Sequence, residues 1–361
     1  MSFIYSIKDT YRAAVEAATG GKNTVMYDDQ GYPSIMVCIP KFYLDDVITG
    51  MTHTVHPAFI VNGVEKPYIY ISKYQNIIQN GRAYSLPGQD PATYVNFDQA
   101  LAYCYAKGQG WHLMSNAESA AIALWCKKNG FMPRGNNNYG CDIGATYEKG
   151  RETYFDTEAG KTGRVATGSG PASWSHDGTP DGIYDLNGNV TEWNSGLRLN
   201  AGEIQVIQDN NAAILNSDHT AASTLWKAIA SADGSLVAPG TAGTLKYDYT
   251  ATPTVGSNSV ELNNTIDNAQ PDDTATGLKT FETLTAHSGI TVPTLAKALA
   301  LFPIDSSCGG DALYFRNNGE RLPLRGGFWR LGAHAGVFYL SLGDVRAGSS
   351  DGIGFRSAFV L

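Results

Sequence analysis

The sequence is poor in cysteine and in charge, and it holds no long apolar run. Its cysteines show neither the spacing of a zinc cluster nor the density of a disulfide framework: Cys38, Cys104, Cys126, Cys141 and Cys308. Charged residues make up 17%, and the net charge of −8 comes without any cluster of Lys or Arg, which argues against nucleic-acid binding. No stretch of about 18 apolar residues occurs, so we expect no membrane span.

Signals for export and for zinc binding are also missing. Residues 1–23 lack the basic start, the continuous apolar stretch and the small-residue cleavage site of a signal peptide. We therefore expect the chain to fold in a reducing cytoplasm. The seven histidines show no HxH or HExxH spacing, so the sequence does not predict a zinc site.

Glycine and tyrosine, by contrast, are abundant, with 40 and 20 copies in 361 residues. This composition favours many tight turns and aromatic contacts over a helical bundle. A chain of this length can bury one large core, or a core with a sizeable insertion.

Hydrophobic periodicity predicts a mixture of helices and strands. We expect a first helix over residues 8–18 and buried strands over residues 34–42 and 66–74. Residues 96–107 have apolar side chains at helical spacing behind the N-cap residue Asn96. A further helix begins at the capping box of residues 115–118 (SNAE).

Composition also suggests how the chain is divided. Residues 135–170 are polar and glycine-rich and are predicted to form a long loop. Residues from 202 to about 310 are rich in Ala, Thr, Asn, Asp and Ser, and we interpret them as an insertion of short strands and loops. We therefore predict an N-terminal segment (1–33) and one domain (34–361) interrupted by the insertion at about 202–310.

Four segments carry motifs in a fixed order. Residues 70–74 (YISKY) are similar to a strand-x-KYEVT pattern, and residues 112–118 (HLMSNAE), behind a helix, to RLPTEAEWE. Residues 182–193 (GIYDLNGNVTEW) are close to GLYDMxGNVWEW, and LRGG at 324–327 with IGFR at 353–356 matches RGGxW…GFR. Together they resemble the formylglycine-generating-enzyme/sulfatase-modifying branch of the C-type lectin fold. This resemblance implies an α+β fold with two helices, short antiparallel strands, many loops and an insertion.

The closing segment, residues 325–356, also resembles the variable region of proteins diversified by retroelements. In that family, positions encoded by asparagine codons in a template alternate with fixed scaffold residues. The resemblance implies the scaffold Arg325, Gly326, Gly327, Trp329, Gly332, residues 335–340, Leu342, Arg346 and residues 353–356. It implies the variable, ligand-binding positions Phe328, Arg330, Leu331, His334, Ser341, Gly343, Asp344, Val345, Ala347, Gly348, Ser350, Asp351 and Gly352.

The residue types at these variable positions agree with the resemblance. Adenine mutagenesis of an AAC codon yields only NNC codons, which exclude Lys, Glu, Gln, Met and Trp. None of these five residue types occurs at the variable positions.

Strand periodicity predicts that scaffold side chains and variable side chains lie on opposite faces of a strand. Residues 337–342 are predicted to form a strand in which Leu340 and Leu342 face the core and Ser341 faces the other side. The flanking segments, 328–334 and 343–352, are predicted loops. An anchor cluster for a ligand would consist of Phe328, Arg330, Leu331 and His334. The alternative is that Phe328 and Leu331 are partly buried and that Gly343, Gly348 and Gly352 are turn residues.

Residues 185–192 present candidate calcium ligands. In the enzyme relatives this stretch supplies side-chain oxygens at its outer positions, here Asp185 and Glu192, and backbone carbonyls at its inner positions, here Gly188 and Val190. Calcium prefers such oxygen ligands. Alternatively, the stretch is a structural turn in which both carboxylates accept backbone N–H groups. Any calcium here would be structural, and we expect no required cofactor.

The resemblance implies a binding protein and not an enzyme. The oxidase relatives need a cysteine pair near the closing segment, and this sequence has no cysteine after Cys308, so we expect no catalytic residues. The implied function is a hypervariable receptor-binding protein of a phage or prophage, attached to the virion or cytoplasmic before assembly, and we expect a homo-oligomer, a trimer. Its partner would be a host cell-surface protein or glycan. Two alternatives remain: a calcium-dependent carbohydrate-binding lectin, and an inactive sulfatase-modifying-enzyme relative.

Overall fold

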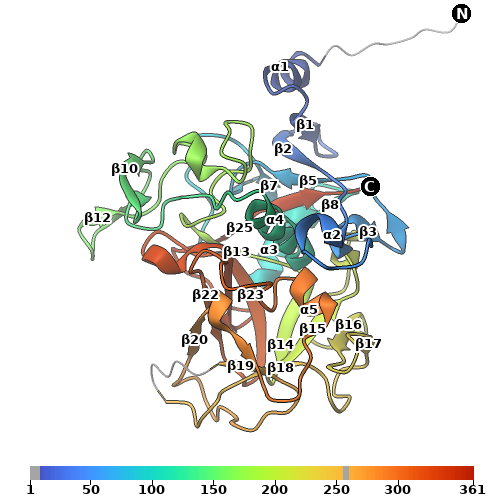
Figure 1. Ribbon diagram of the computed structural model, residues 1–361. Coiled ribbons are helices and arrows are strands. Elements are labelled where there is room, and N and C mark those ends of the chain that lie inside the picture. The colour runs from blue at the N-terminus through green and yellow to red at the C-terminus, as the bar shows by residue number, and fades with distance from the viewer. Residues whose placement is uncertain (1–8, 255–259) are drawn as a thin grey trace, which may run out of the picture.

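The computed structural model describes residues 9–254 and 260–361. Helix α1 (Thr10–Ala18) confirms the predicted first helix, although Lys8 of that prediction lies outside the described residues. Figure 1 shows α1 at the edge of the molecule, where it leads into strand β1 (Asn23–Tyr27). No helix in the described residues is long and apolar enough to cross a membrane.

The first sheet joins the two ends of the chain. Its strand order is β1–β2–β5–β26–β8, with β2 at Pro33–Pro40, β5 at Tyr68–Ser72, β26 at Ser357–Phe359 and β8 at Trp111–Leu113. The predicted strands at 34–42 and 66–74 are therefore confirmed as β2 and β5. The N-terminal segment contributes the edge strand β1, and the C-terminal strand lies between β5 and β8.

Two helices pack beside this sheet, and both begin where their capping residues predict. Helix α3 (Phe97–Tyr105) is capped by Asn96, whose side chain accepts the backbone N–H of Gln99. Helix α4 (Asn116–Lys128) begins at the reciprocal capping box of Ser115 and Glu118. The largest hydrophobic cluster joins the inner face of the first sheet, α4 and the second sheet.

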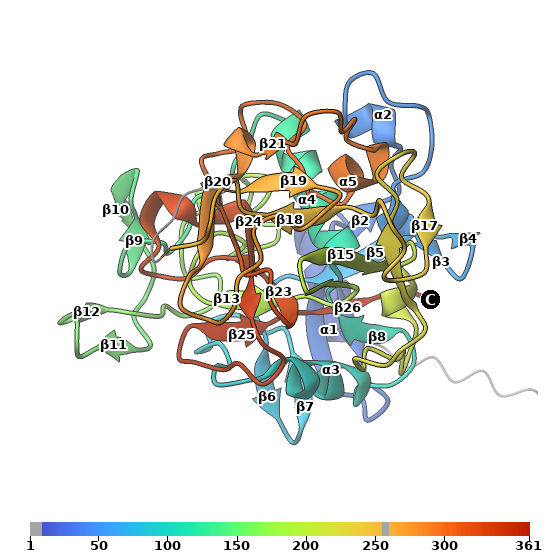
Figure 2. The ribbon, with the colours of Figure 1, turned by 90° about the horizontal axis from the view of Figure 1, so that it is seen from below.

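The second sheet contains thirteen strands among the described residues and includes the insertion. Its main path runs β20–β22–β24–β23–β14–β15–β18–β19–β21 (Figure 2). The bounds along it are β20 Gly277–Thr280, β22 Ala312–Phe315, β24 Gly336–Asp344, β23 Glu320–Gly326, β14 Leu197–Asn200, β15 Glu203–Ile207, β18 Lys246–Asp248, β19 Glu261–Asn263 and β21 Thr285–Ala286. Off this path lie β13 Thr191–Trp193, β25 Ile353–Phe355, β16 Trp226–Ile229 and β17 Leu236–Val237. The insertion thus extends a sheet that also contains the closing segment.

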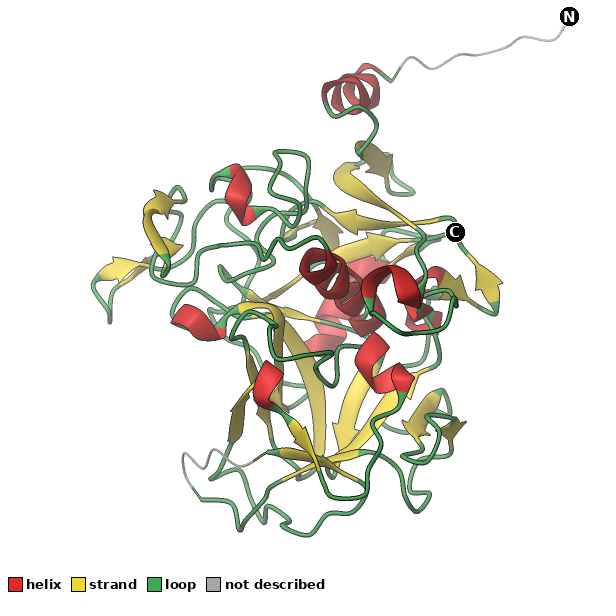
Figure 3. Ribbon diagram, in the orientation of Figure 1, coloured by secondary structure: helices red, strands yellow, loops and turns green. Residues whose placement is uncertain are grey.

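The predicted loop at 135–170 contains two short hairpins. They are formed by β9 (Cys141–Asp142) with β10 (Ala145–Lys149), and by β11 (Phe155–Asp156) with β12 (Lys161–Thr162). Both project from one side of the molecule, as the secondary-structure colouring of Figure 3 shows. The remaining short helices and strands are α2 Leu44–Val47, α5 Thr294–Ala298, β3 Ile60–Val61, β4 Val64–Glu65, β6 Ile77–Gln79 and β7 Arg82–Tyr84.

Strand β24 is fixed at its start by a buried carboxylate. Asp311, at the end of the insertion, accepts the backbone N–H of Phe338 at 2.7 Å through Oδ2. Burial raises the pKa of Asp311 well above its usual range. Gly336 leaves room for this carboxylate, because a Cβ atom there would lie 2.2 Å from Asp311 Oδ1.

We predict that Gly336→Ala lowers the free energy of unfolding by about 1–3 kcal/mol, since the methyl group displaces a short, buried side chain. Gly343→Ala on the same strand is the matched control. Its Cβ would meet nothing closer than Ser341 Oγ at 3.7 Å, so a change of at most about 0.5 kcal/mol is expected. Urea titrations of both variants test this, and equal effects would contradict it.

Candidate ligand-binding surface

The variable positions lie on β24 and on the two loops beside it. All of them are at least partly exposed except Ser341 and Gly352. The segment between β23 and β24 carries Phe328 to His334 and ends in the short 3-10 helix Gly332–His334. The segment between β24 and β25 carries Val345 to Gly352. We call these positions, together, the variable surface.

The scaffold residues between them are largely buried. Trp329 and Arg356 are completely buried, as are Leu340 and Leu342, which confirms the predicted orientation of the strand. Trp329 contacts the ring of Tyr154 edge-on, with centroids 5.8 Å apart. The chain therefore alternates, over a few residues, between side chains that fill the core and side chains that reach solvent.

A cavity of about 280 Å³ opens on the variable surface. Leu331, Ser341, Gly343 and Asp344 line it on one side. Its other walls come from Tyr339 of the scaffold and from residues outside the closing segment, Thr276, Tyr314 and Arg316. Ser341, although buried, thus faces the cavity as its strand position predicts. Burial raises the pKa of the Asp344 carboxyl above its usual range.

The proposed anchor cluster is continuous with this cavity. His334 Nδ1 lies 3.1 Å from the hydroxyl of Tyr314. The Arg330 guanidinium lies 5.1 Å from the centre of the Phe328 ring. A Cβ atom at Gly352 would lie 2.8 Å from Phe328 Cδ2, so this ring also touches the second loop. Phe328 and Leu331 are partly buried, as the alternative interpretation held, but each also reaches solvent.

Sequence reasoning did not identify the cavity's second wall. Thr276 follows the low-complexity stretch of the insertion, and Tyr314 and Arg316 belong to β22 or follow it. Their proximity to β24 arises from the parallel pairing of β22 with β24, in which Tyr314 lies opposite Ser341. No local motif predicts that β22 pairs with β24 and not with β23, which follows β22 in the sequence.

Each of the four candidate calcium-ligand residues places one oxygen atom near the same nitrogen atom, Nε2 of Gln75. Nε2 of Gln75 lies 3.1 Å from the carbonyl oxygen of Asp185, 3.4 Å from that of Gly188 and 2.8 Å from that of Val190. It also lies 2.9 Å from Oε1 of Glu192. We call residues 185–192 with these contacts the 185–192 turn. In the KYEVT pattern, Gln75 stands where the family has Glu.

Of the two carboxylates of the turn, Asp185 accepts a backbone N–H group, as the structural-turn alternative held, whereas Glu192 pairs with a guanidinium. Glu192 pairs with the Arg356 guanidinium through two contacts of 2.8 and 2.9 Å. The side chain of Asp185 points elsewhere: its Oδ2 accepts the N–H of Gly168, and its buried Oδ1 has no hydrogen-bond partner. Burial raises the pKa of Asp185 to about 6. Among the described residues, no group of three or more His, Cys, Asp or Glu side chains could hold a metal ion.

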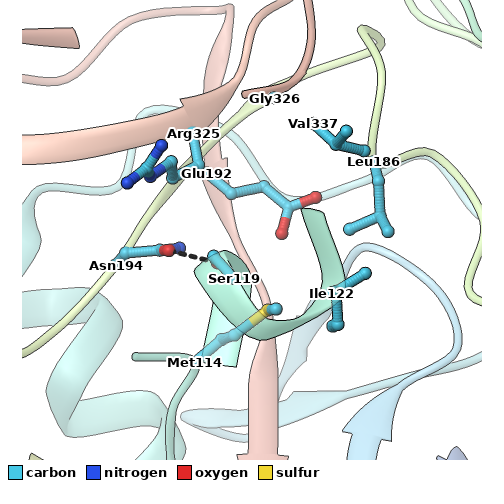
Figure 4. A pocket seen from close by; sticks show the side chains of 9 residues that line it. All are labelled: Met114, Ser119, Ile122, Leu186, Glu192, Asn194, Arg325, Gly326 and Val337. Atoms are coloured by element: carbon cyan, nitrogen blue, oxygen red, sulfur yellow. Dashed lines mark hydrogen bonds between the residues drawn. The ribbon is translucent and has the colours of Figure 1, made fainter. Parts of the chain in front are cut away.

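A second, much smaller cavity lies beneath the scaffold. It measures about 20 Å³, room for one water molecule, and is drawn in Figure 4. Glu192, Arg325 and Asn194 supply its polar lining together with Ser119, which hydrogen-bonds to Asn194. No cysteine lines it.

We predict that Asp185→Asn stabilises the protein above neutral pH. The folded pKa of about 6 exceeds the ordinary aspartate value of 3.8, so the folded state retains a proton that the unfolded chain releases. Stability is therefore lost as pH rises from about 4 to 6, by up to about 3 kcal/mol. Asparagine carries no charge and tolerates the positive φ of 63° at this position.

The check compares unfolding of Asp185→Asn and the unchanged chain at pH 4.5 and 7.5. The variant's advantage should be about 1–3 kcal/mol at the higher pH and should shrink at the lower one. Asp233→Asn, at an exposed aspartate, is the control and should gain nothing as pH rises. A difference in unfolding free energy that is the same at both pH values would contradict the raised pKa of Asp185.

Solved structures with similarity to the chain include two of known source. PvdO from Pseudomonas aeruginosa is 15% identical, with 94% of this chain and 98% of that chain covered and a TM-score of 0.35. Treponema denticola variable protein 1 is 13% identical, with 93% and 98% covered and a TM-score of 0.32. No curated protein matches the chain in sequence.

Residues 10–216 match the sulfatase-modifying factor enzyme 1-like domain. The matched range contains the motifs at 70–74, 112–118 and 182–193, and it ends before the closing segment. It also spans more than half of the 361 residues. The match confirms the expected α+β, C-type-lectin-like fold of the formylglycine-generating-enzyme type. The chain therefore belongs to the family of the sulfatase-modifying factor enzyme 1-like domain.

Proposed function

We propose that this protein is a ligand-binding scaffold whose variable surface is diversified by a retroelement. The observation that carries the proposal is the placement of the variable positions. They gather on loops and around one cavity, while most of the scaffold residues between them are buried. Such a division lets the binding side chains change without disturbing the core.

The chemistry of the surface suits a macromolecular partner. Partly exposed Phe328 and Leu331 offer apolar contact area, and Arg330 and His334 offer hydrogen-bond donors beside them. Aromatic and arginine side chains supply much of the binding energy at protein interfaces. We infer a host cell-surface protein or glycan as the partner, bound by a phage-encoded or prophage-encoded, virion-attached protein that associates as a homo-oligomer.

An oxidase function is not favoured. The closing segment, residues 325–356, has no cysteine, and the last cysteine, Cys308, is buried. Burial raises the pKa of the Cys308 thiol to about 11, which suppresses the thiolate that such chemistry needs. The cavity beneath the scaffold has room for only one water molecule. These observations support a binding protein without catalytic residues.

The origin of the diversity can be tested in the neighbouring DNA. We expect a reverse-transcriptase gene and an adenine-rich near-copy of the bases that encode the closing segment. Asparagine codons should stand in that copy at the variable positions and not at buried Trp329 or Arg356. Flanking DNA without either feature would contradict the retroelement proposal.

The binding proposal is tested with a displayed library. NNC codons replace the variable positions that are at least partly exposed, while buried Ser341 and Gly352 are left unchanged, and the library is selected against purified lysozyme as a probe. We expect most clones to remain folded, because surface substitutions usually change stability by no more than about 0.5 kcal/mol each. We also expect lysozyme binders to emerge after selection.

The matched control randomises as many exposed positions around the β3–β4 hairpin, on the other side of the molecule from the variable surface (Figure 1). Binders should be rarer there, since the exposed residues of this hairpin, Val64 and Glu65 among them, lack the aromatic and arginine anchors of the variable surface. Equal yields from both libraries, or widespread unfolding of the first, would contradict the proposal.

Two variable positions should depend on each other. Because Gly352 packs against the Phe328 ring, Gly352→Ala alone should cost about 1–2 kcal/mol of unfolding free energy. In a Phe328→Ala background the same change should cost less than about 0.5 kcal/mol, giving a coupling of about 1 kcal/mol. Gly343→Ala combined with Phe328→Ala is the control pair and should be additive. Additivity for both pairs in a double-mutant cycle would show that the two loops are independent.

A further inference from the structure

The oxygen atoms around Gln75 Nε2 are of the kind that surround a bound cation. A side-chain amide has two N–H groups, yet four oxygen atoms lie within 3.4 Å of Gln75 Nε2. Three are backbone carbonyls from one turn and the fourth belongs to a carboxylate. Hard oxygen ligands of this kind, arranged about one point, are what calcium selects.

We propose that the Gln75 side chain takes the place of calcium in this protein, so that the 185–192 turn is assembled without metal. An N–H group donates to the same carbonyl oxygens that would otherwise coordinate an ion. Since the nitrogen occupies the point where they converge, an ion cannot bind there at the 2.3–2.6 Å that calcium requires unless Gln75 moves away.

Two neighbouring contacts hold the amide in this orientation. Nδ2 of Asn189 donates to Oε1 of Gln75 at 2.9 Å, which leaves the Nε2 group directed at the turn. Asn189 is itself fixed, because its Oδ1 accepts the backbone N–H of Val165 at 2.9 Å. Gln75 and Asn189 are both completely buried.

Charge balance points the same way. Glu192 is the one carboxylate that faces Gln75 Nε2, and its charge is already paired with Arg356. The other carboxylate of the turn, Asp185, directs its Oδ2 at Gly168 and presents only its carbonyl oxygen to Gln75. A neutral donor therefore suffices at this point, whereas a divalent ion would add uncompensated charge to a buried site.

The turn supports the variable surface directly. Gly188 donates its N–H to the Gly326 carbonyl, and Thr191 donates its N–H to the Gly352 carbonyl. These contacts fix both ends of the closing segment. Resting on the proposed function, the inference implies that ligand binding by the variable surface resists chelators, unlike binding by a calcium-dependent lectin.

The test measures calcium binding and thermal stability, and needs no ligand of the variable surface. The unchanged chain should show no heat of calcium binding by calorimetry, and EDTA or millimolar calcium should shift its Tm by no more than about 1 °C. Gln75→Glu, which restores the family's carboxylate, should melt about 5–10 °C lower in EDTA and recover in calcium.

Two variants keep the test specific. Gln79→Glu makes the same chemical change at an exposed position on β6 and should respond to neither EDTA nor calcium. Gln75→Met removes the donor without adding a ligand, so its Tm should fall and calcium should not restore it.

Calcium binding by the unchanged chain, or a lower Tm of that chain in EDTA, would overturn the proposal. So would a Gln75→Glu chain that calcium fails to stabilise. Since every measurement concerns the 185–192 turn alone, failure here would leave the proposed binding function standing, and failure of the library would leave this inference standing.

Discussion

The buried guanidinium of Arg356 ties together parts of the chain on which both the fold and the variable surface depend. It donates to both oxygens of Glu192 on β13, to the Tyr184 carbonyl before the 185–192 turn, and to the Ser72 carbonyl on β5. One side chain thus joins the first sheet to the strand beneath the variable surface. Its five donors are well matched to this task, and losing either member of such a buried pair leaves the other charge without compensation.

Around this junction, strand pairing holds the backbone of the closing segment, while some of its side chains are exposed. Strand β13 pairs with β23 on one side and with β25 on the other, so both ends of the segment are held in register. Trp329 fills the core between them and β24 contributes Leu340 and Leu342. The side chains that can vary are attached to this fixed backbone at its exposed points. Thr276 of the insertion, with Tyr314 and Arg316 that follow the insertion, adds a wall that does not belong to the closing segment.

Local features of the fold could be predicted from sequence because local interactions determine them. The caps at Asn96 and Ser115 lie within three residues of their partners, and the alternation in β24 follows from strand geometry. The hairpins within 135–170 were missed, since short strands in a glycine-rich stretch leave little periodicity. The role of Gln75 is visible only in three dimensions, because its partners are more than a hundred residues away. The cavity wall of Tyr314 and Arg316 depends on the pairing of β22 with β24, which skips the intervening strand β23.

The position of β26 has a consequence for how the chain reaches its folded state. Residues 357–359 lie between β5, which also pairs with β2 from the first third of the sequence, and β8, whose partner strand is β26. Until these residues have been synthesised, β5 lacks its neighbour on one side and β8 lacks its partner strand, so this sheet forms only after the closing segment has been translated. Since β26 directly follows the variable region, a substitution that spread only a few codons further would strike the middle of a sheet. Under the proposed function, diversification would therefore have a sharp physical boundary at its downstream end.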